Sequence, residues 1–270
     1  MMNFRNSVIL IVSLFAGWRG IAIADSTPRV EVTEAKFKIV LGDGRILQGR
    51  DVVGVILHLR NRSGDPIEVR IDSMTLAAGN SDSGIELYGM SRRDARGEWQ
   101  PLCKPGADGR ALGFPLPGVD ASDDDAEAGS ESFSIACTAG ARGKCVMLGY
   151  RPWTAGAGGE SLRPYFDACV RMMRADYCGD GRSYTRPGIR VDLWDSAGVQ
   201  TAQTDMPFEA AWRADGALCL ARTRVPGLST LENLLAACPR LATTPPAECE
   251  AASHRPGSGA LLWNRSAIAD

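Results

Sequence analysis

Four aspartates lie close together in the middle of the sequence, where a pair of carboxylates could serve as general acid and general base. Glycoside hydrolysis needs only two such groups, provided that the surroundings raise the pKa of one of them. Spacing along the chain does not set the distance between the carboxylates in space. A carboxylate-dependent hydrolase is therefore an alternative interpretation, and its candidate residues are Asp176, Asp180, Asp192 and Asp195.

Other catalytic arrangements have few candidate residues. A serine or cysteine nucleophile normally requires a neighbouring base, and the chain contains only two histidines, His58 and His254. We expect His58 in a strand, packed or at its rim, and His254 in the exposed loop "ASHRPGSG". No G-x-S-x-G turn is present. The sequence leaves enzymatic activity open but favours a protein without it.

The stretch "RMMRADYCGDGRSYTRPG", residues 171–188, joins the end of a predicted helix to glycine-rich turns. Six arginines and three aspartates lie in residues 162–190, with Arg190 included, and arginine side chains suit carboxylates and phosphates. One interpretation is a site for an anionic ligand. Its residues would be Asp176, Asp180, Arg182, Tyr184 and Arg186.

The favoured interpretation of this stretch is a structural corner, because salt-linked corners are common in proteins. Gly179 is expected to end the helix in the left-handed conformation. A carboxylate at Asp176 faces the partial negative charge of the helix end, so a cation is expected beside it. The candidate cations are Arg174, Arg182 and Arg186.

Composition argues against several kinds of partner. The formal net charge of −2 disfavours a nucleic-acid-binding protein, which needs concentrated positive charge. The adjacent acids Asp123, Asp124 and Asp125 point in different directions, unlike the spaced ligands of a calcium loop. The chain has no Cys-x-x-Cys pair and only two histidines, so we predict no metal site and no cofactor.

The first residues have the features of a secretory signal peptide, predicted over residues 1–24. Arg5 supplies the positive charge, an apolar run follows from Ser7 to Trp18, and Ala22-Ile23-Ala24 precedes the cleavage point. About 12 apolar residues fall short of the roughly 20 that span a bilayer. We therefore predict a protein exported to the periplasm or the outside of the cell, with no membrane span after cleavage.

Eight cysteines would enter an oxidising compartment on export, where disulfides persist. Cys169 and Cys178 are nine residues apart, and a continuous helix between them would place them too far apart to bridge each other. We expect them to pair with Cys137 and Cys145 of a nearby hairpin; a Cys137–Cys145 bridge is the alternative. The predicted structural cysteines are Cys103, Cys137, Cys145, Cys169, Cys178, Cys219, Cys238 and Cys249.

The elements that must position these residues are mainly antiparallel strands, so we predict an α+β, mainly β fold held by disulfides. Glycine turns predict hairpins around Gly42–Gly44, Ser63–Pro66 and Ala214–Gly216, and a strand-turn-strand unit is predicted around Gly140–Gly143. Apolar spacing near 3.6 predicts one main amphipathic helix at about 162–176 and a shorter helix at about 229–237. The predicted regions are 25–103 (β-rich), 104–132 (an acidic loop or linker rich in Gly, Pro and Ser) and 133–270.

The region from Phe133 to Gln200 resembles a bacterial family, the ADYC domain-containing proteins. The resemblance rests on "ACTAGARGKCV", "GYRPW", "ACVRMMRADYCGDGRSYT" and "VDLWDSAGVQ", which include the tetrapeptide Ala175–Cys178. It implies an exported bacterial protein and brings no assigned activity or catalytic residues.

These observations together predict a monomeric, exported binding or structural module that acts on an unknown, possibly anionic ligand at the cell envelope or outside the cell. The hydrolase is the main alternative. An inhibitor or toxin-like secreted factor is a third.

Overall fold

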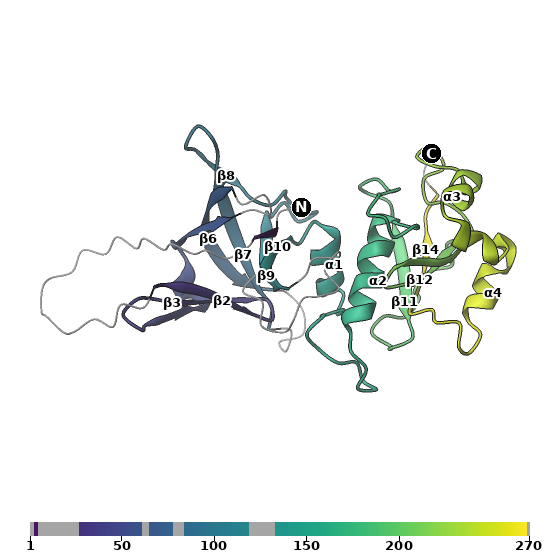
Figure 1. Cartoon of the computed structure of the whole chain (residues 1–270), viewed down its shortest axis with the longest axis horizontal. Coiled ribbons are helices and arrows are strands. Elements are labelled where there is room, and N and C mark those ends of the chain that lie inside the picture. The colour runs from purple at the N-terminus through teal and green to yellow at the C-terminus, as the bar shows by residue number, and fades with distance from the viewer. Residues whose placement is uncertain (1–2, 5–26, 61–64, 78–83, 119–132, 269–270) are drawn as a thin grey trace, which may run out of the picture. The chain divides into compact units, whose positions relative to one another are not determined.

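A computed structural model describes residues 3–4, 27–60, 65–77, 84–118 and 133–268. The chain forms two compact units, Met1–Gly143 and Lys144–Asp270 (Figure 1). The predicted signal peptide lies outside the described residues except for β1 (Asn3–Phe4), which pairs with β10. A chain cleaved before Asp25 would lack β1.

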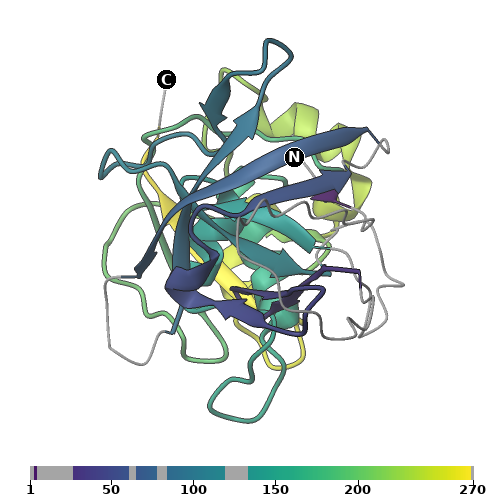
Figure 2. The same cartoon turned by 90° about the vertical axis from the view of Figure 1, so that its left-hand side faces the viewer.

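The larger sheet of the first unit has seven antiparallel strands in the described residues. Its order is β1-β10-β9-β7-β6-β5, with β8 paired to β7. The turn between β7 and β8 stands out from the rest of this unit in both views (Figures 1 and 2). The strands are β5 (Ile56–Arg60), β6 (Pro66–Leu76), β7 (Glu86–Arg93), β8 (Trp99–Pro101), β9 (Leu112–Pro117) and β10 (Phe133–Cys137).

A smaller sheet in the same unit contains β2 (Arg29–Thr33), β3 (Lys36–Val40) and β4 (Ile46–Gln48), followed by the 3₁₀ helix η1 (Gly49–Val52). The strand pairs of both hairpins predicted in this unit are confirmed: β3 pairs with β4 around Gly44 (φ +83°), and β5 pairs with β6. Residues 61–64 of the second predicted turn lie outside the described residues. The ring of Phe37 lies edge-on to Tyr88 and Phe133 of the larger sheet, with centroids 5.0 and 5.8 Å apart. These aromatic contacts join the two sheets in one core.

One segment predicted as a loop contains a buried strand. Within residues 104–132, β9 pairs with β7 and β10 in the larger sheet. Phe114 and Leu116 are fully buried. The strand was not predicted because the segment is rich in Gly and Pro. Gly113 is needed for packing, since an added Cβ would lie only 2.9 Å from Sγ of Cys103.

The second unit is built on a four-stranded antiparallel sheet of order β11-β14-β12-β13. Helix α2 packs on β12, β13 and β14, and α4 packs on β12 and β13. Neighbouring strand residues Ala211 and Trp212 point to opposite faces, Ala211 toward Cys249 of α4 and Trp212 toward Tyr177 after α2. The two helices therefore cover opposite faces. The strands are β11 (Val191–Asp195), β12 (Phe208–Arg213), β13 (Gly216–Leu220) and β14 (Leu262–Ser266).

The two predicted helices are confirmed as α2 (Arg163–Arg174) and α3 (Leu231–Ala237). Three short helices follow α3: η3 (Pro239–Thr243), η4 (Pro246–Glu248) and α4 (Cys249–Ser253). In the described parts of the chain, no helix has both the length and the apolar character to cross a membrane.

A further helix, α1 (Ala141–Met147), corrects the predicted strand-turn-strand unit around Gly140–Gly143. The first strand exists as β10, but the second arm is helical. Cys145 and Val146 are adjacent and both fully buried, which a half-buried strand with alternating faces does not allow.

All eight cysteines lie within the described residues and are paired. The predicted separation of Cys169 from Cys178 is confirmed. Of the two predicted helix-to-hairpin bridges, Cys145 does pair with Cys169, but Cys137 and Cys178 pair elsewhere, and the alternative Cys137–Cys145 bridge is wrong. The alternative fails because Cys145 lies on helix α1 and not on a strand paired with the strand of Cys137. The bridges are Cys103–Cys137, Cys145–Cys169, Cys178–Cys238 and Cys219–Cys249.

Candidate functional site

The corner begins at the end of α2, and Ala175 is the residue that ends this helix. Ala175 adopts a left-handed conformation (φ 48°, ψ 41°), and its N–H donates to the carbonyl of Met172 (2.9 Å). The N–H of Asp176 donates to the carbonyl of Arg171 (2.9 Å). These two bonds define a Schellman motif, which satisfies carbonyls at the helix end. The prediction that Gly179 ends the helix is therefore wrong, because the chain reverses four residues earlier.

Asp176 is fully buried directly after this reversal. Its Oδ2 lies 2.5 Å from Nη1 of Arg171 and accepts a hydrogen bond from the N–H of Gly181 (3.0 Å). The prediction of a cation beside Asp176 is confirmed, but the cation is Arg171 rather than Arg174, Arg182 or Arg186. The Schellman turn folds Asp176 back over the last helical turn, where Arg171 lies.

Tyr177 fills the space between α2 and the sheet. Its ring stacks on Trp212 of β12 and on Tyr184, with centroids 5.4 and 6.1 Å apart. Its hydroxyl donates to Oε1 of Glu209 (3.1 Å) and accepts from the main-chain N–H of Arg224 (2.9 Å). Burial and the charge of Glu209 raise the pKa of this hydroxyl well above its usual value, so it remains a donor.

Glu209 and Arg224 form an ion pair that is removed from solvent. The guanidinium of Arg224 makes two bonds to the carboxylate, Nε to Oε2 (3.0 Å) and Nη2 to Oε1 (2.9 Å). Nη2 also donates to the carbonyl of Met172 on α2 (2.9 Å). The network of Tyr177, Glu209 and Arg224, called the buried network below, therefore joins the helix end to the sheet.

Glu209 and Arg224 were not predicted as site residues. Pairing between β12 and β14 shifts register between Phe208 and Ala210, and this bulge directs Glu209 toward Tyr177. One signal was available, because Glu209 is the only charged residue among the apolar positions 208–212. A charge in such a run needs a buried partner.

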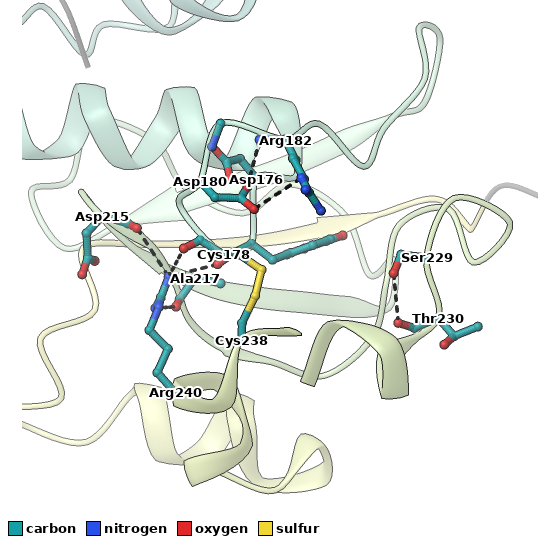
Figure 3. Close-up of a disulfide and its surroundings, with 12 residues drawn as sticks. Asp176, Cys178, Asp180, Arg182, Asp215, Ala217, Ser229, Thr230, Cys238 and Arg240 are labelled. Carbon is teal, nitrogen blue, oxygen red and sulfur yellow. Dashed lines mark hydrogen bonds and ion pairs between the residues drawn. A yellow bond between two sulfur atoms is a disulfide. The ribbon is translucent and has the colours of Figure 1, made fainter. Parts of the chain in front are cut away.

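Cys178 and Gly179 fasten the corner to the edge of the sheet (Figure 3). Cys178 forms its disulfide with Cys238, which lies between α3 and η3. The carbonyl of Tyr177 accepts a hydrogen bond from the N–H of Ala217 on β13 (3.0 Å). A Cβ added to Gly179 would lie 1.8 Å from the carbonyl oxygen of Asp215, so only glycine permits this approach.

Arg240 of η3 completes this attachment. Its guanidinium donates to the carbonyls of Tyr177 (3.1 Å), Cys178 (3.1 Å) and Ala217. Since β13 is the last strand of its sheet, the corner and Arg240 together cover the outer edge of that strand at Ala217.

The five predicted ligand residues separate into two groups. Asp176 is inside the corner, and Tyr184 packs on Tyr177 while its N–H donates to the carbonyl of Arg174 (3.1 Å). Asp180, Arg182 and Arg186 are exposed. Nε of Arg182 lies 3.7 Å from Oδ2 of Asp180. Ligand binding by these residues stays a prediction.

The remaining predicted carboxylates, Asp192 and Asp195, lie on β11 and hold the loop that follows it. Asp192 accepts from the N–H groups of Gln203 (3.0 Å) and Thr204 (2.7 Å). Burial favours the neutral acid, but these hydrogen bonds outweigh it and lower the pKa of Asp192. Asp195 accepts from Tyr150 Oη (2.6 Å) and from the N–H groups of Ala197, Val199 and Gln200.

Main-chain N–H groups thus donate to all four carboxylates of the predicted hydrolase, since Asp176 and Asp180 accept from Gly181 and Arg182. This accounts for their positions by local structure. The hydrolase itself stays a prediction.

The two histidines lie far from these carboxylates in the sequence, and each has its own neighbours. His58 is partly exposed on β5, with Nδ1 3.5 Å from Oε1 of Glu68. His254 is exposed and stacks on Trp263, with ring centroids 4.6 Å apart. In the described residues, no group of three or more His, Cys, Asp and Glu side chains is arranged to hold a metal ion.

Fold and corner define a class of protein: mainly β, disulfide-bonded, with a buried network that fastens a helix end to the edge of an antiparallel sheet. The chain belongs to the ADYC domain family, which matches it over residues 49–226. The match contains the tetrapeptide Ala175–Cys178, Glu209 and Arg224, whereas Cys238 lies after it. No curated protein and no solved structure matches the chain.

Proposed function

We propose that this protein is an exported binding or structural module of the bacterial cell envelope or exterior. The observation that supports this most directly is the pairing of all eight cysteines. Disulfides persist in oxidising compartments and are rare in the reducing cytosol. The predicted signal peptide points to the same compartment.

In this proposal the tetrapeptide Ala175–Cys178 is a structural clasp, by which we mean that it fastens the end of α2 to the sheet. The ligand binds to the exposed loop that follows it, residues 180–186. Oδ2 of Asp176 is bonded to Arg171, and the hydroxyl of Tyr177 belongs to the buried network, so both groups are occupied inside the protein. In the exposed loop, 75% of the Arg182 side chain is accessible. Arg182 and Arg186 are both exposed and four residues apart in the sequence, and arginine side chains suit a carboxylate or phosphate of an envelope component.

The proposal is tested by affinity capture with protein purified in the oxidised state from its own compartment. Envelope and culture fractions are passed over wild type and over Arg182→Ala/Arg186→Ala. We expect wild type to retain a specific polymer or protein, and the double variant to lose at least 90% of it. Capture by neither protein, or equal capture by both, would contradict the assignment to this loop.

Arg110 supplies a matched control. It is similarly exposed and also pairs with an aspartate two residues earlier, Asp108, at 2.8 Å. Arg110→Ala removes the same kind of charge from the first unit, so it should capture as much as wild type.

A further inference from the structure

We infer that residues 231–243, called the strap below, form a redox-sensitive cover that opens when the Cys178–Cys238 disulfide is reduced. The strap contains α3, Cys238 and η3. This goes beyond the proposed function and does not depend on the identity of the ligand.

Few contacts hold the strap to the rest of the second unit. Its buried hydrophobic side chains are Leu234 (1% exposed), Cys238 (6%) and Leu241 (0%). The strap is also held by the disulfide to Cys178, the hydrogen bonds of Arg240 and the packing of η3 on β13. A segment with so little buried apolar surface belongs to the part of a protein that opens most easily.

The disulfide and the Arg240 bonds meet at one place, the edge of β13 (Figure 3). Arg240 donates to the carbonyl of Ala217, and the N–H of Ala217 donates to the carbonyl of Tyr177. Loss of the disulfide leaves the guanidinium as the main polar link between strap and edge. Opening therefore exposes Arg240 and weakens the cover over Ala217.

The rest of the unit keeps its own fasteners after this bond is broken. Cys145–Cys169 still holds α1 to α2, Cys219–Cys249 still holds α4 to β13, and the buried network still joins α2 to β12. Reduction of this one bond therefore opens the strap without unfolding the unit.

Exposure makes this bridge more accessible to a reductant than two of the others. Cys178 is partly exposed, whereas both members of Cys145–Cys169 and Cys219–Cys249 are at most 1% exposed. A dithiol reductant attacks through a thiolate on the sulfur of Cys178, which releases Cys238 and forms a mixed disulfide. The second thiol of the reductant then displaces Cys178, so the reductant becomes a disulfide and the protein gains two thiols.

Trypsin reports on the strap because it cleaves after arginine only when the side chain is free. The oxidised full chain is titrated with dithiothreitol, a dithiol, and samples are alkylated so that mass spectrometry identifies each reduced bridge. We expect Cys178–Cys238 to be reduced before Cys145–Cys169 and Cys219–Cys249. As Cys178–Cys238 is reduced, the rate of tryptic cleavage between Arg240 and Leu241 should rise at least tenfold. Hydrogen exchange of the main-chain amide of Ala217 should also become faster.

The Cys103–Cys137 bridge is the matched control, since Cys137 is also partly exposed but lies in the first unit. Cys103→Ser/Cys137→Ser should leave the Arg240 site resistant, whereas Cys178→Ser/Cys238→Ser should make it sensitive without reductant. If either variant fails to fold, the wild-type titration decides the question alone. Reduction of Cys219–Cys249 before Cys178–Cys238, or continued resistance at Arg240 after Cys178–Cys238 is reduced, would overturn the inference.

Discussion

Two arginine–carboxylate pairs, one from each unit, lie in opposite environments. In the second unit, Nη2 of Arg224 lies 2.9 Å from Oε1 of Glu209, and the two side chains are 1% and 0% exposed. On β6 and β7 of the first unit, Nη1 of Arg93 lies 3.1 Å from Oε2 of Glu68, and these side chains are 51% and 31% exposed. The distances are nearly equal, so burial is what distinguishes the pairs.

The surface pair belongs to a set of cross-strand contacts on one face of the larger sheet. Arg93 is paired in register with Trp99, and the guanidinium carbons of Arg70 and Arg93 lie 4.6 and 5.9 Å from that ring. Each side chain there can exchange its protein partner for water. A buried charge has no such alternative, so loss of one partner leaves the other unsolvated. The buried pair should therefore control stability, and the surface pair should not.

The largest expected effect is that of Arg224→Met. It leaves the charge of Glu209 buried without its ion-pair partner, and should lower the free energy of unfolding by about 3–5 kcal/mol. Urea denaturation of the oxidised protein measures this. A loss below about 1 kcal/mol would mean that water reaches Glu209, and the contrast with the surface pair would fail.

Cys178→Ser/Cys238→Ser should have the next largest effect. The bridge joins residues 60 positions apart, the longest separation of the four. Release of a loop of that length should lower the free energy of unfolding by about 2–4 kcal/mol, chiefly through the entropy of the unfolded chain. Unchanged stability in oxidising buffer would contradict a role for this bridge in the clasp.

Asp192→Asn should have a smaller, pH-dependent effect. Its pKa is lowered on folding, so Asp192 contributes stability above its usual pKa of 3.8, and this stability is lost as pH falls through the folded value. We expect a loss of about 1–2 kcal/mol at pH 7, from weaker hydrogen bonds to Thr204 and Gln203. The difference from wild type should shrink below about pH 4. Asp205→Asn in the same loop is the control, and an effect independent of pH would be evidence against this account.

The smallest effect is expected for Arg93→Ala, which removes the exposed pair with Glu68. We expect a loss below about 1 kcal/mol, because exposed ion pairs contribute little to stability. Thermal or urea unfolding measures it beside Arg224→Met. Losses of similar size in the two variants would remove the distinction between the buried and the exposed pair.

Local signals predicted much of this fold correctly. The turn glycine Gly44 and alternation along β6 led to the right strand pairs, and apolar spacing led to α2 and α3. Errors arose where distant residues decide the structure. Phe114 is buried within a Gly- and Pro-rich segment, and Cys145 lies on a helix whose position depends on Cys169.

The candidate site was predicted less completely than the fold. The corner, its tetrapeptide and the need for a cation at Asp176 followed from helix chemistry, but the choice of Arg171 required the turn geometry. Glu209 is 32 residues and Arg224 is 47 residues from Tyr177, so no local pattern connects them. The partner of Cys178 could not be chosen among several cysteines by spacing alone.

A double-mutant cycle between Tyr177→Phe and Glu209→Gln tests most directly whether the tetrapeptide is a structural clasp. The free energy of unfolding is measured for wild type, both single variants and the double variant, all with disulfides intact. If the Tyr177 hydroxyl fastens the helix end to β12, the two substitutions should be coupled by at least about 1 kcal/mol. Effects that add to within about 0.3 kcal/mol would contradict the clasp.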